Sequence, residues 1–239
     1  MVNMESTNNN VPRHIGIILD GNRRFSKRLM MKPWKGHEFG AKKVEALFKW
    51  CHEYNIRELT LYSFSIENFY RPKREFDYLM KLFKKELNKI IKDKRLEKYQ
   101  IRVRFIGRIQ MFDKELQRLI HIVMENTKKY EKHTINMAMA YGGRQEVIDA
   151  VMKIASDLKK GKLRLEDINE DLFSKNLYLN SQPDLIIRTG GEKRTSNFLN
   201  FQAAYAEWIF LDILWPEFDK KDFVACLDEY SKRKRRFGK

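Results

Sequence analysis

Short apolar runs alternate along this chain with segments of helical periodicity, and that alternation limits the possible folds more than any other feature of the sequence. The runs are nearly continuously apolar, which is typical of strands that a sheet buries on both faces. They span His14–Leu19, Leu59–Phe64, Ile101–Ile106, Ile135–Ala140, Asp184–Arg188 and Trp208–Ile213. Strands that alternate with helices predict a parallel α/β sheet in a single domain.

Apolar residues between these runs recur with the i, i+3, i+4, i+7 spacing of one helix face. The clearest patterns cover Val44–Cys51, Phe76–Leu87, Leu116–Val123 and Val147–Leu158, and two further helices are expected over Asp167–Leu177 and Asp219–Lys232. No internal repeat or linker interrupts them. We therefore expect a flexible N-terminal tail over residues 1–12 and one domain over residues 13–239.

Polar segments follow five of the six predicted strands, and four of these segments contain glycine. The segments are Asp20-Gly21-Asn22-Arg23-Arg24, Ser65 to Pro72, Gly107-Arg108, Tyr141 to Arg144, and Arg188 to Arg194; the second carries its polar residues without a glycine. Glycine also ends elements and arginine also solvates loops, so one such segment would mean little. Parallel sheets bind ligands beyond the carboxyl ends of their strands. Five polar ends at one rim favour an anion site, and phosphate is the anion we expect.

The charge balance also indicates an anionic partner. The 239 residues include 48 Lys and Arg against 32 Asp and Glu, a formal net charge of +16. Such a charge suits nucleic acid, a membrane surface or a phosphorylated substrate. Arg23–Lys35 and Ser231–Lys239 each hold six cations and no acid. We expect the first to be a basic loop at the anion site and the second to be a solvated tail.

Several kinds of site are excluded by the motifs that the sequence lacks. Neither G-x-x-x-x-G-K, nor G-x-G-x-x-G, nor H-E-x-x-H occurs, and two cysteines, Cys51 and Cys226, are too few for a disulfide framework or a four-cysteine zinc site. We expect both thiols to be buried and reduced. Asp20 lies among cations, where a carboxylate can share Mg²⁺ with phosphate oxygens that arginines bind in bidentate fashion.

No apolar run approaches the ~18–20 residues that span a bilayer. The polar start, Met1 to Asn10, has no apolar signal segment. We therefore expect a cytoplasmic protein, with peripheral association at the membrane as the further option.

A series of motifs, in order along nearly the whole chain, resembles the cis-prenyltransferases, the family of undecaprenyl and dehydrodolichyl diphosphate synthases. The motifs are His14 to Arg24, Gly36-His37, Leu61 to Pro72, Asn136 to Arg144, Asp184 to Glu192, Arg194 to Phe198, Ala204 to Glu207, Trp215-Pro216 and Arg235 to Gly238. The paired Arg23-Arg24 is closest in style to archaeal members.

The resemblance implies a homodimer built on a six-stranded, mainly parallel sheet flanked by helices. It implies Mg²⁺-dependent, repeated condensation of isopentenyl diphosphate with an allylic diphosphate, farnesyl or geranylgeranyl. The product would be a long-chain polyprenyl diphosphate, the precursor of a glycosyl carrier lipid, and it would associate with the membrane.

The resemblance also assigns roles to individual residues. Asp20 and Asn68 would be catalytic, and Asp20 would bind the metal together with Glu207 from the other subunit. The substrate-binding residues would be Gly21, Asn22, Arg23, Arg24, Phe25, His37, Ser65, Ile66, Glu67, Phe69, Arg71, Arg188, Arg194, Thr195 and Ser196. Residues 65–71 would form a flexible loop that closes over the substrates. Because an amide is a poor base, we expect Asn68 to position a proton relay or the diphosphate.

The sequence departs from bacterial members at three positions. Pro33 stands where several of them have an arginine, so Lys32 or Lys35 is left to supply that charge. Lys193 replaces a histidine of some members, and Phe69 replaces a tryptophan.

Three other functions compete with this interpretation. They are a nucleotide or sugar-phosphate enzyme on a similar sheet, a nucleic-acid-binding protein, and a non-catalytic partner subunit. The sequence shows no nucleic-acid motif. Its aspartate and arginine motifs are intact, which argues against a non-catalytic subunit.

Product length is expected to depend on an apolar tunnel. Apolar residues on the helix Phe76–Ile91 and on the fourth strand could form its wall, to which Phe105 of the third strand could add, and the alternative is that they all belong to the core. The wall candidates are Leu79, Met80, Phe83, Leu87, Phe105, Ile135, Met137 and Met139.

Overall fold

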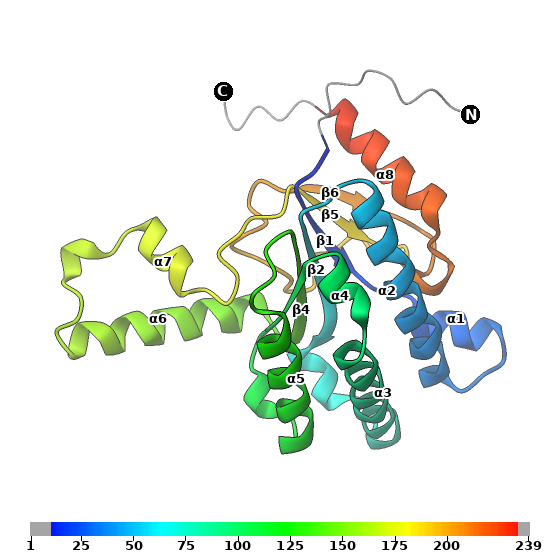
Figure 1. Ribbon diagram of the computed structural model, residues 1–239, viewed down its shortest axis with the longest axis horizontal. Coiled ribbons are helices and arrows are strands. Elements are labelled where there is room, and N and C mark those ends of the chain that lie inside the picture. The colour runs from blue at the N-terminus through cyan, green and yellow to red at the C-terminus, as the bar shows by residue number, and fades with distance from the viewer. Residues whose placement is uncertain (1–10, 234–239) are drawn as a thin grey trace.

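Six parallel strands form the centre of the computed structural model, which describes residues 11–233 (Figure 1). The strands are β1 (His14–Ile18), β2 (Glu58–Ser65), β3 (Ile101–Ile106), β4 (His133–Tyr141), β5 (Leu185–Arg188) and β6 (Glu207–Phe210), in the spatial order β3-β4-β2-β1-β5-β6. All neighbouring pairs are parallel. The predicted fold is confirmed, with β6 ending at Phe210 rather than Ile213.

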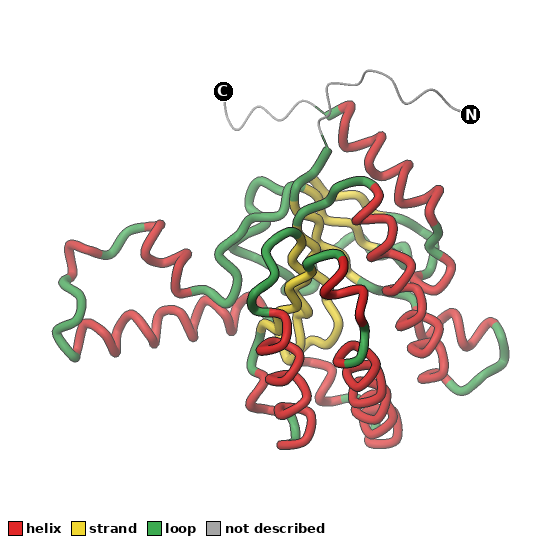
Figure 2. Tube along the Cα trace, viewed as in Figure 1, coloured by secondary structure: helices red, strands yellow, loops and turns green. Residues whose placement is uncertain are grey.

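Within residues 11–233, eight α-helices connect and cover these strands (Figure 2). They are α1 (Asn22–Arg28), α2 (Gly36–Glu53), α3 (Lys73–Ile91), α4 (Lys94–Lys98), α5 (Lys114–Thr127), α6 (Gly143–Lys159), α7 (Glu170–Asn176) and α8 (Lys220–Lys232). Acidic or amide side chains cap several of them: Asp113 accepts from the backbone of α5, and Asp219 accepts from that of α8. The stretch 23–35 is not the basic loop that we expected, since it begins inside α1.

Helices cover one face of the sheet and form two neighbouring hydrophobic cores with it. Residues of α2 and α8, such as Leu47 and Phe223, pack on β1, β2 and β5. Residues of α3 and α5, such as Leu79 and Leu116, pack on β2, β3 and β4. The opposite face is covered mainly by irregular chain around Leu179, Phe198 and Leu199. This arrangement leaves the carboxyl ends of the strands at one rim.

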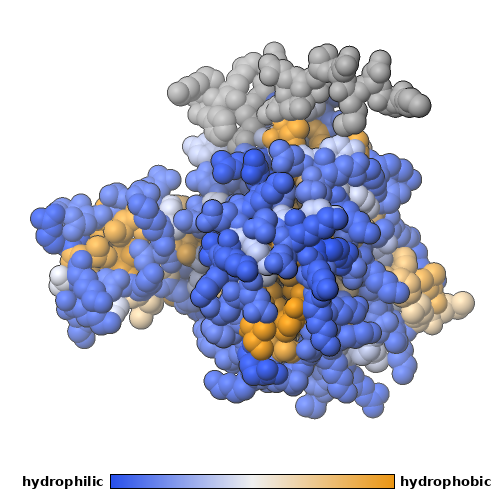
Figure 3. Space-filling view, viewed as in Figure 1, coloured by the Kyte–Doolittle hydropathy of each residue, from blue (hydrophilic) through white to orange (hydrophobic). Residues whose placement is uncertain are grey.

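Helices α6 and α7 form an arm that projects from the body of the molecule (Figure 1, left). The arm carries exposed apolar side chains on α6, among them Ile148 and Met152, which is 65% exposed. Apolar surface on the arm is visible in Figure 3. A helix face of this kind is typical of a protein interface.

Cys51 and Cys226 are both buried and free, and burial raises the pKa of both thiols. Of the helices in the described part of the chain, none combines the length and the apolarity that crossing a bilayer requires. Two expectations fall outside residues 11–233: the flexible tail, of which only residues 11 and 12 are described, and the motif Arg235 to Gly238.

Candidate active site

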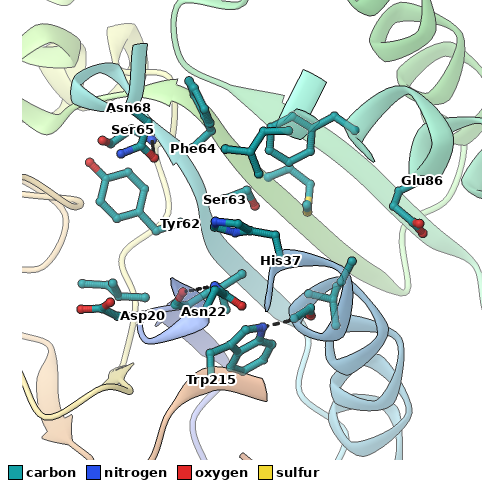
Figure 4. A pocket seen from close by; sticks show the side chains of 18 of the residues that line it. Asp20, Asn22, His37, Tyr62, Ser63, Phe64, Ser65, Asn68, Glu86 and Trp215 are labelled. Atoms are coloured by element: carbon teal, nitrogen blue, oxygen red, sulfur yellow. Dashed lines mark hydrogen bonds between the residues drawn. The ribbon is translucent and has the colours of Figure 1, made fainter. Parts of the chain in front are cut away.

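A cavity of about 1140 Å³ opens at the carboxyl ends of the strands and extends between α2, α3 and the sheet (Figure 4). Its two ends differ in chemistry. The polar end is lined by predicted site residues, namely Asp20, Gly21, Asn22, Arg23, Arg24, His37, Ser65, Glu67, Asn68, Arg71, Arg194, Thr195 and Ser196. The expectation that the polar strand ends meet at one rim is therefore confirmed for β1, β2, β4 and β5.

The end of β3 is the exception. Arg108 is bound in bidentate fashion by Asp149 of α6, at 2.8 and 2.9 Å, and does not line the cavity. This ion pair connects α6, in the arm, to the end of β3.

The other end of the cavity is apolar. Its wall is formed by α3 and the sheet, with Leu79, Leu82, Phe83, Val103, Ile135 and Met137. Four of the expected wall residues, Met80, Leu87, Phe105 and Met139, lie instead in the core. Beyond the apolar wall the lining becomes charged, at Glu45, Glu86, Lys89, Asp93 and Arg95.

Asp20 is fixed at the polar end by neighbours on three segments. Its Oδ1 accepts from the backbone N–H of Gly21 at 2.6 Å, and its Oδ2 accepts from Arg188 Nη2 at 3.0 Å. Arg24 Nη2 lies 3.3 Å from Oδ1. Gly21 adopts φ 109°, and a Cβ there would lie 2.9 Å from Leu214, so the turn requires glycine. The carboxylate thus faces the cavity in a fixed orientation.

Arg188 lies behind this carboxylate and is only 3% exposed. It donates to Ser196 Oγ at 2.7 Å and to the carbonyl of Arg194. Its Nε has no hydrogen-bond partner within residues 11–233. Arg188 is absent from the cavity lining, so in this structure it positions Asp20 and the segment 194–196.

A buried glutamate that the sequence analysis missed organises the second group of cations. Glu75 on α3 is 2% exposed. Its carboxylate lies 2.8 Å from Arg71 Nη1, 3.7 Å from His37 Nε2 and 3.7 Å from Arg23 Nε. Burial, and then the charges of Arg71 and Arg23, lower the pKa of His37 against the opposing effect of Glu75. A neutral His37 can then accept or donate at the cavity.

Residues 65–71, expected to be a flexible loop, contain a 3₁₀-helix over Ile66–Tyr70. Asn68 Oδ1 accepts from the backbone N–H of Ser65 at 3.2 Å as part of a capping box. Phe69 packs edge-on against Phe64, with ring centroids 5.1 Å apart, and joins the core. In this structure Asn68 shapes the segment, and Phe69 is not part of the cavity wall.

Phe25, Ile66 and Glu207 also lie off the cavity. Phe25 packs on Phe39, with ring centroids 5.3 Å apart. Glu207 begins β6, opposite Leu185, and is paired with Arg233 at 2.7 Å. Asp20 contacts the other end of β5, through Arg188. At about 3.3 Å per residue along β5, the two carboxylates of one chain are too far apart to share an ion.

Three further residues, Tyr62, Arg144 and Gln145, line the polar end. Arg144 was expected at this rim as part of a polar strand end but was not assigned a role, and Tyr62 and Gln145 were not predicted. Arg144 follows Gly142-Gly143 at the end of β4, a signal present in the sequence. Glu75 has a weaker signal, its i, i+4 spacing from Arg71.

A magnesium ion would find suitable but incomplete ligands here. Asp20 presents one carboxylate among cations, which fits a hard ion that completes its shell with diphosphate oxygens and water. No group of three potential ligating side chains occurs within residues 11–233. The donor set therefore fits an ion bound together with substrate.

Comparisons with known proteins agree with this geometry. Residues 18–238 match the family model "Putative undecaprenyl diphosphate synthase". The chain belongs to the cis-prenyltransferase family. A geranylgeranyl-diphosphate-specific tritrans,polycis-undecaprenyl-diphosphate synthase of Pyrococcus horikoshii is 48% identical over 231 residues, which cover 96% of this chain and 88% of that protein. Its counterpart in Methanocaldococcus jannaschii is 47% identical over 234 residues, covering 96% and 84%.

Solved cis-prenyltransferase-like structures share the fold. The crystal structure of lavandulyl diphosphate synthase from Lavandula x intermedia, in complex with dimethylallyl diphosphate, has a TM-score of 0.91 and 32% identity, covering 96% of this chain and 99% of that one. A probable undecaprenyl diphosphate synthase from Campylobacter jejuni has a TM-score of 0.80 and 33% identity, covering 96% and 100%.

Proposed function

We propose that this cis-prenyltransferase condenses isopentenyl diphosphate repeatedly with geranylgeranyl diphosphate to make a long-chain polyprenyl diphosphate. One observation carries the proposal: a single cavity joins a cluster of cations around Asp20 to a long apolar wall. A diphosphate with a growing hydrocarbon tail has the same two-part chemistry. The names of the archaeal relatives support geranylgeranyl over farnesyl diphosphate as the primer.

The polar residues divide between two diphosphates. Arg23, Arg24, His37 and Arg71 surround the space in front of α1 and would hold the allylic diphosphate, while Arg194, Thr195 and Ser196 would hold isopentenyl diphosphate. Charge-assisted hydrogen bonds contribute about 1.5–3 kcal/mol each, so several arginines suffice to hold both groups.

The reaction follows from where charge develops. The allylic C–O bond breaks, and negative charge grows on the departing diphosphate, where fixed arginines offset it. The double bond of isopentenyl diphosphate attacks the allylic carbon, and the proton lost from the resulting cation passes to the departed diphosphate. Bound Mg²⁺, held by Asp20 and diphosphate oxygens, would add Lewis-acid stabilisation of the leaving group.

The proposed enzyme is a homodimer. The exposed apolar face of α6 supports this, with Ile148 56%, Val151 47% and Met152 65% exposed. The position of Glu207 supports it too, because this glutamate cannot reach Asp20 of its own chain. In a dimer, Glu207 of one subunit would complete the metal site of the other. The product would serve as a glycosyl carrier lipid precursor and partition into membrane.

Labelled isopentenyl diphosphate offered with each primer in turn tests the function. We expect label in long products with geranylgeranyl diphosphate and Mg²⁺, and far less with farnesyl diphosphate. Reactions without primer serve as the control. Absence of labelled polyprenyl product with every allylic primer would refute the activity, whereas equal use of both primers would refute only the primer assignment.

A further inference from the structure

The end of α1 exposes apolar side chains that the core does not use. Met30 is 96% exposed and Leu29 is 49% exposed. Phe25, one turn earlier on the helix, packs on Phe39, which is itself 37% exposed. The orange surface at the right edge of Figure 3 lies where Figure 1 places α1 and the turn after it. We call the segment Leu29–Trp34 the α1 tip.

The backbone of the α1 tip closes a defined turn. The N–H of Met31 donates to the carbonyl of Ser26 at 2.9 Å, and the N–H of Met30 donates to that of Lys27 at 3.1 Å. These two bonds make a Schellman motif, whose left-handed residue is usually glycine. Met30 occupies that position with φ 53°.

Two other helices end in the same motif with residues suited to it. At the end of α2, Asn55 has φ 55°, and the N–H of Ile56 donates to Cys51. At the end of α6, Gly161 has φ 66°, and the N–H of Lys162 donates to Asp157. Methionine is unfavourable in this conformation, and its side chain makes almost no contact with the rest of the chain. The turn alone therefore gives no reason for an apolar residue at position 30.

Cations lie next to the apolar residues of the α1 tip in the sequence. The acid-free stretch Arg23–Lys35 includes Lys27, Arg28 and Lys32 around it. Arg28 pairs with Glu217 at 2.7 Å, and Lys35 lies 3.3 Å from Glu38. Lys27 and Lys32 have no ion-pair partner in the described chain, and Lys32 Nζ lies 5.8 Å from the ring of Trp34. Exposed apolar residues flanked by cations, next to a tryptophan, match an anionic lipid surface.

We propose that the α1 tip docks this protein on the surface of an anionic lipid bilayer. Leu29 and Met30 enter the boundary between headgroups and acyl chains, and Lys27 and Lys32 contact lipid phosphates. The first turn of α1 lines the cavity, and a helix of this length spans on the order of 10 Å. Docking would therefore hold the cavity close to lipid; this benefit rests on the proposed lipid product, but the binding itself does not.

Vesicle co-sedimentation of the full-length protein without substrates tests the docking surface. The vesicles are phosphatidylcholine alone, or phosphatidylcholine mixed with an equal amount of phosphatidylglycerol. Met30→Asn keeps the left-handed turn, because asparagine tolerates it. Met111→Asn is the matched control, an exposed methionine (44%) on another segment.

We expect wild type and Met111→Asn to bind the anionic vesicles alike and to dissociate as salt is raised. Met30→Asn should bind on the order of tenfold more weakly, since it no longer buries an apolar side chain. Lys27→Gln should weaken anionic binding and leave neutral binding unchanged.

Three outcomes would overturn the docking surface. One is equal binding of Met30→Asn and wild type. Another is equal binding of wild type to neutral and anionic vesicles. The third is no vesicle binding together with salt-sensitive retention on a DNA duplex. Each is scored without catalysis, so failure here is distinct from failure of the proposed activity, which is measured with labelled isopentenyl diphosphate in detergent.

Discussion

Asp20 holds its carboxylate in a fixed orientation at the polar end of the cavity, since Arg188, Arg24 and the N–H of Gly21 all approach it. We expect Asp20→Asn to lower kcat/KM by about two orders of magnitude or more, as loss of one preorganised electrostatic group does elsewhere. Asparagine is preferable to alanine because it keeps a hydrogen-bond acceptor beside buried Arg188. The measurement is isopentenyl diphosphate incorporation with Mg²⁺.

The control for this change is Asp212→Asn, an exposed aspartate that does not line the main cavity. Its activity should match wild type. Near-normal turnover by folded Asp20→Asn would remove Asp20 from the metal role.

Glu75 gives the second prediction at this scale. Glu75→Gln removes the charge that faces Arg71, His37 and Arg23. We expect a loss of about 2 kcal/mol in the free energy of unfolding, a typical magnitude for a hydrogen bond to a charged group. The KM for the allylic diphosphate should rise, because the cations lose their fixed positions. Urea denaturation and steady-state kinetics measure the two effects.

Glu86→Gln is the matched control, on the same helix at the far end of the cavity. It should leave the KM for the allylic diphosphate unchanged. A wild-type KM in Glu75→Gln would show that the cations are positioned without it.

At the residue scale, the motifs predicted most of the polar lining. Glycine and arginine directly after an apolar run mark the end of a strand, and this pattern is visible in the sequence. They could not show that Arg188 is buried behind Asp20, or that Asn68 is engaged in a capping box. Both facts depend on tertiary contacts. The same holds for Glu75, whose partners come from three separate elements.

Among the elements, the end of α1 offers a test of backbone conformation. Met30→Gly should raise the free energy of unfolding by about 1 kcal/mol, because glycine adopts the left-handed turn without a steric penalty. Gly161→Ala should lower it by a similar amount; a Cβ there meets nothing within 4 Å, so only the backbone is affected. Urea midpoints measure both. Equal signs for the two changes would contradict this account of the turn.

The apolar wall of the cavity, formed by α3 and β4, allows a second test at this scale, which concerns product length. Met137→Trp should shorten the product because it fills the apolar end of the cavity, whereas Phe83→Ala should lengthen or broaden the distribution. Met139→Trp is the contrast: Met139 is 2% exposed in the core, so the change should destabilise the protein by overpacking. The measurement is the chain-length distribution at a fixed substrate ratio. Wild-type distributions from folded Met137→Trp and Phe83→Ala would place the tail elsewhere.

Elements with strong periodicity were predicted well, and α1 was not. Its sequence, Asn22 to Arg28, is mostly charged and has too few apolar residues to show a helical period. It is helical because α2 packs closely against it: a Cβ on Gly40 would lie 2.2 Å from Asn22 Oδ1. The alternation along β4 likewise could not separate Met137 at the cavity from Met139 in the core.

For the whole molecule, the separation of Asp20 and Glu207 leads to a complementation test. Each single variant, Asp20→Asn or Glu207→Gln, should be nearly inactive alone. Mixed dimers of the two should regain activity, because one of their two shared sites carries both native carboxylates. Activity is compared before and after subunit exchange, which a tagged copy verifies. No recovery after proven exchange would contradict the assignment of Glu207 to the partner's site.

The parallel α/β class could be predicted from the sequence, but the order of the strands in the sheet could not. Neither composition nor spacing reveals that β1 lies between β2 and β5, which brings Asp20 beside Arg188. The projecting arm was also unexpected, since its helix α6 shows a normal amphipathic pattern and yet leaves Ile148 and Val151 of the predicted apolar face exposed.

The lining of the cavity changes along its length. It passes from cations through an apolar wall to the charged residues Glu45, Glu86 and Arg95, and this change has a kinetic consequence. Each five-carbon unit that enters the apolar stretch adds roughly 3–4 kcal/mol of burial. Intermediates should therefore dissociate more slowly with every cycle, until the tail meets the charged end and the gain per unit vanishes. Processivity should rise with chain length and then stop rising, so premature release should be confined to the shortest products.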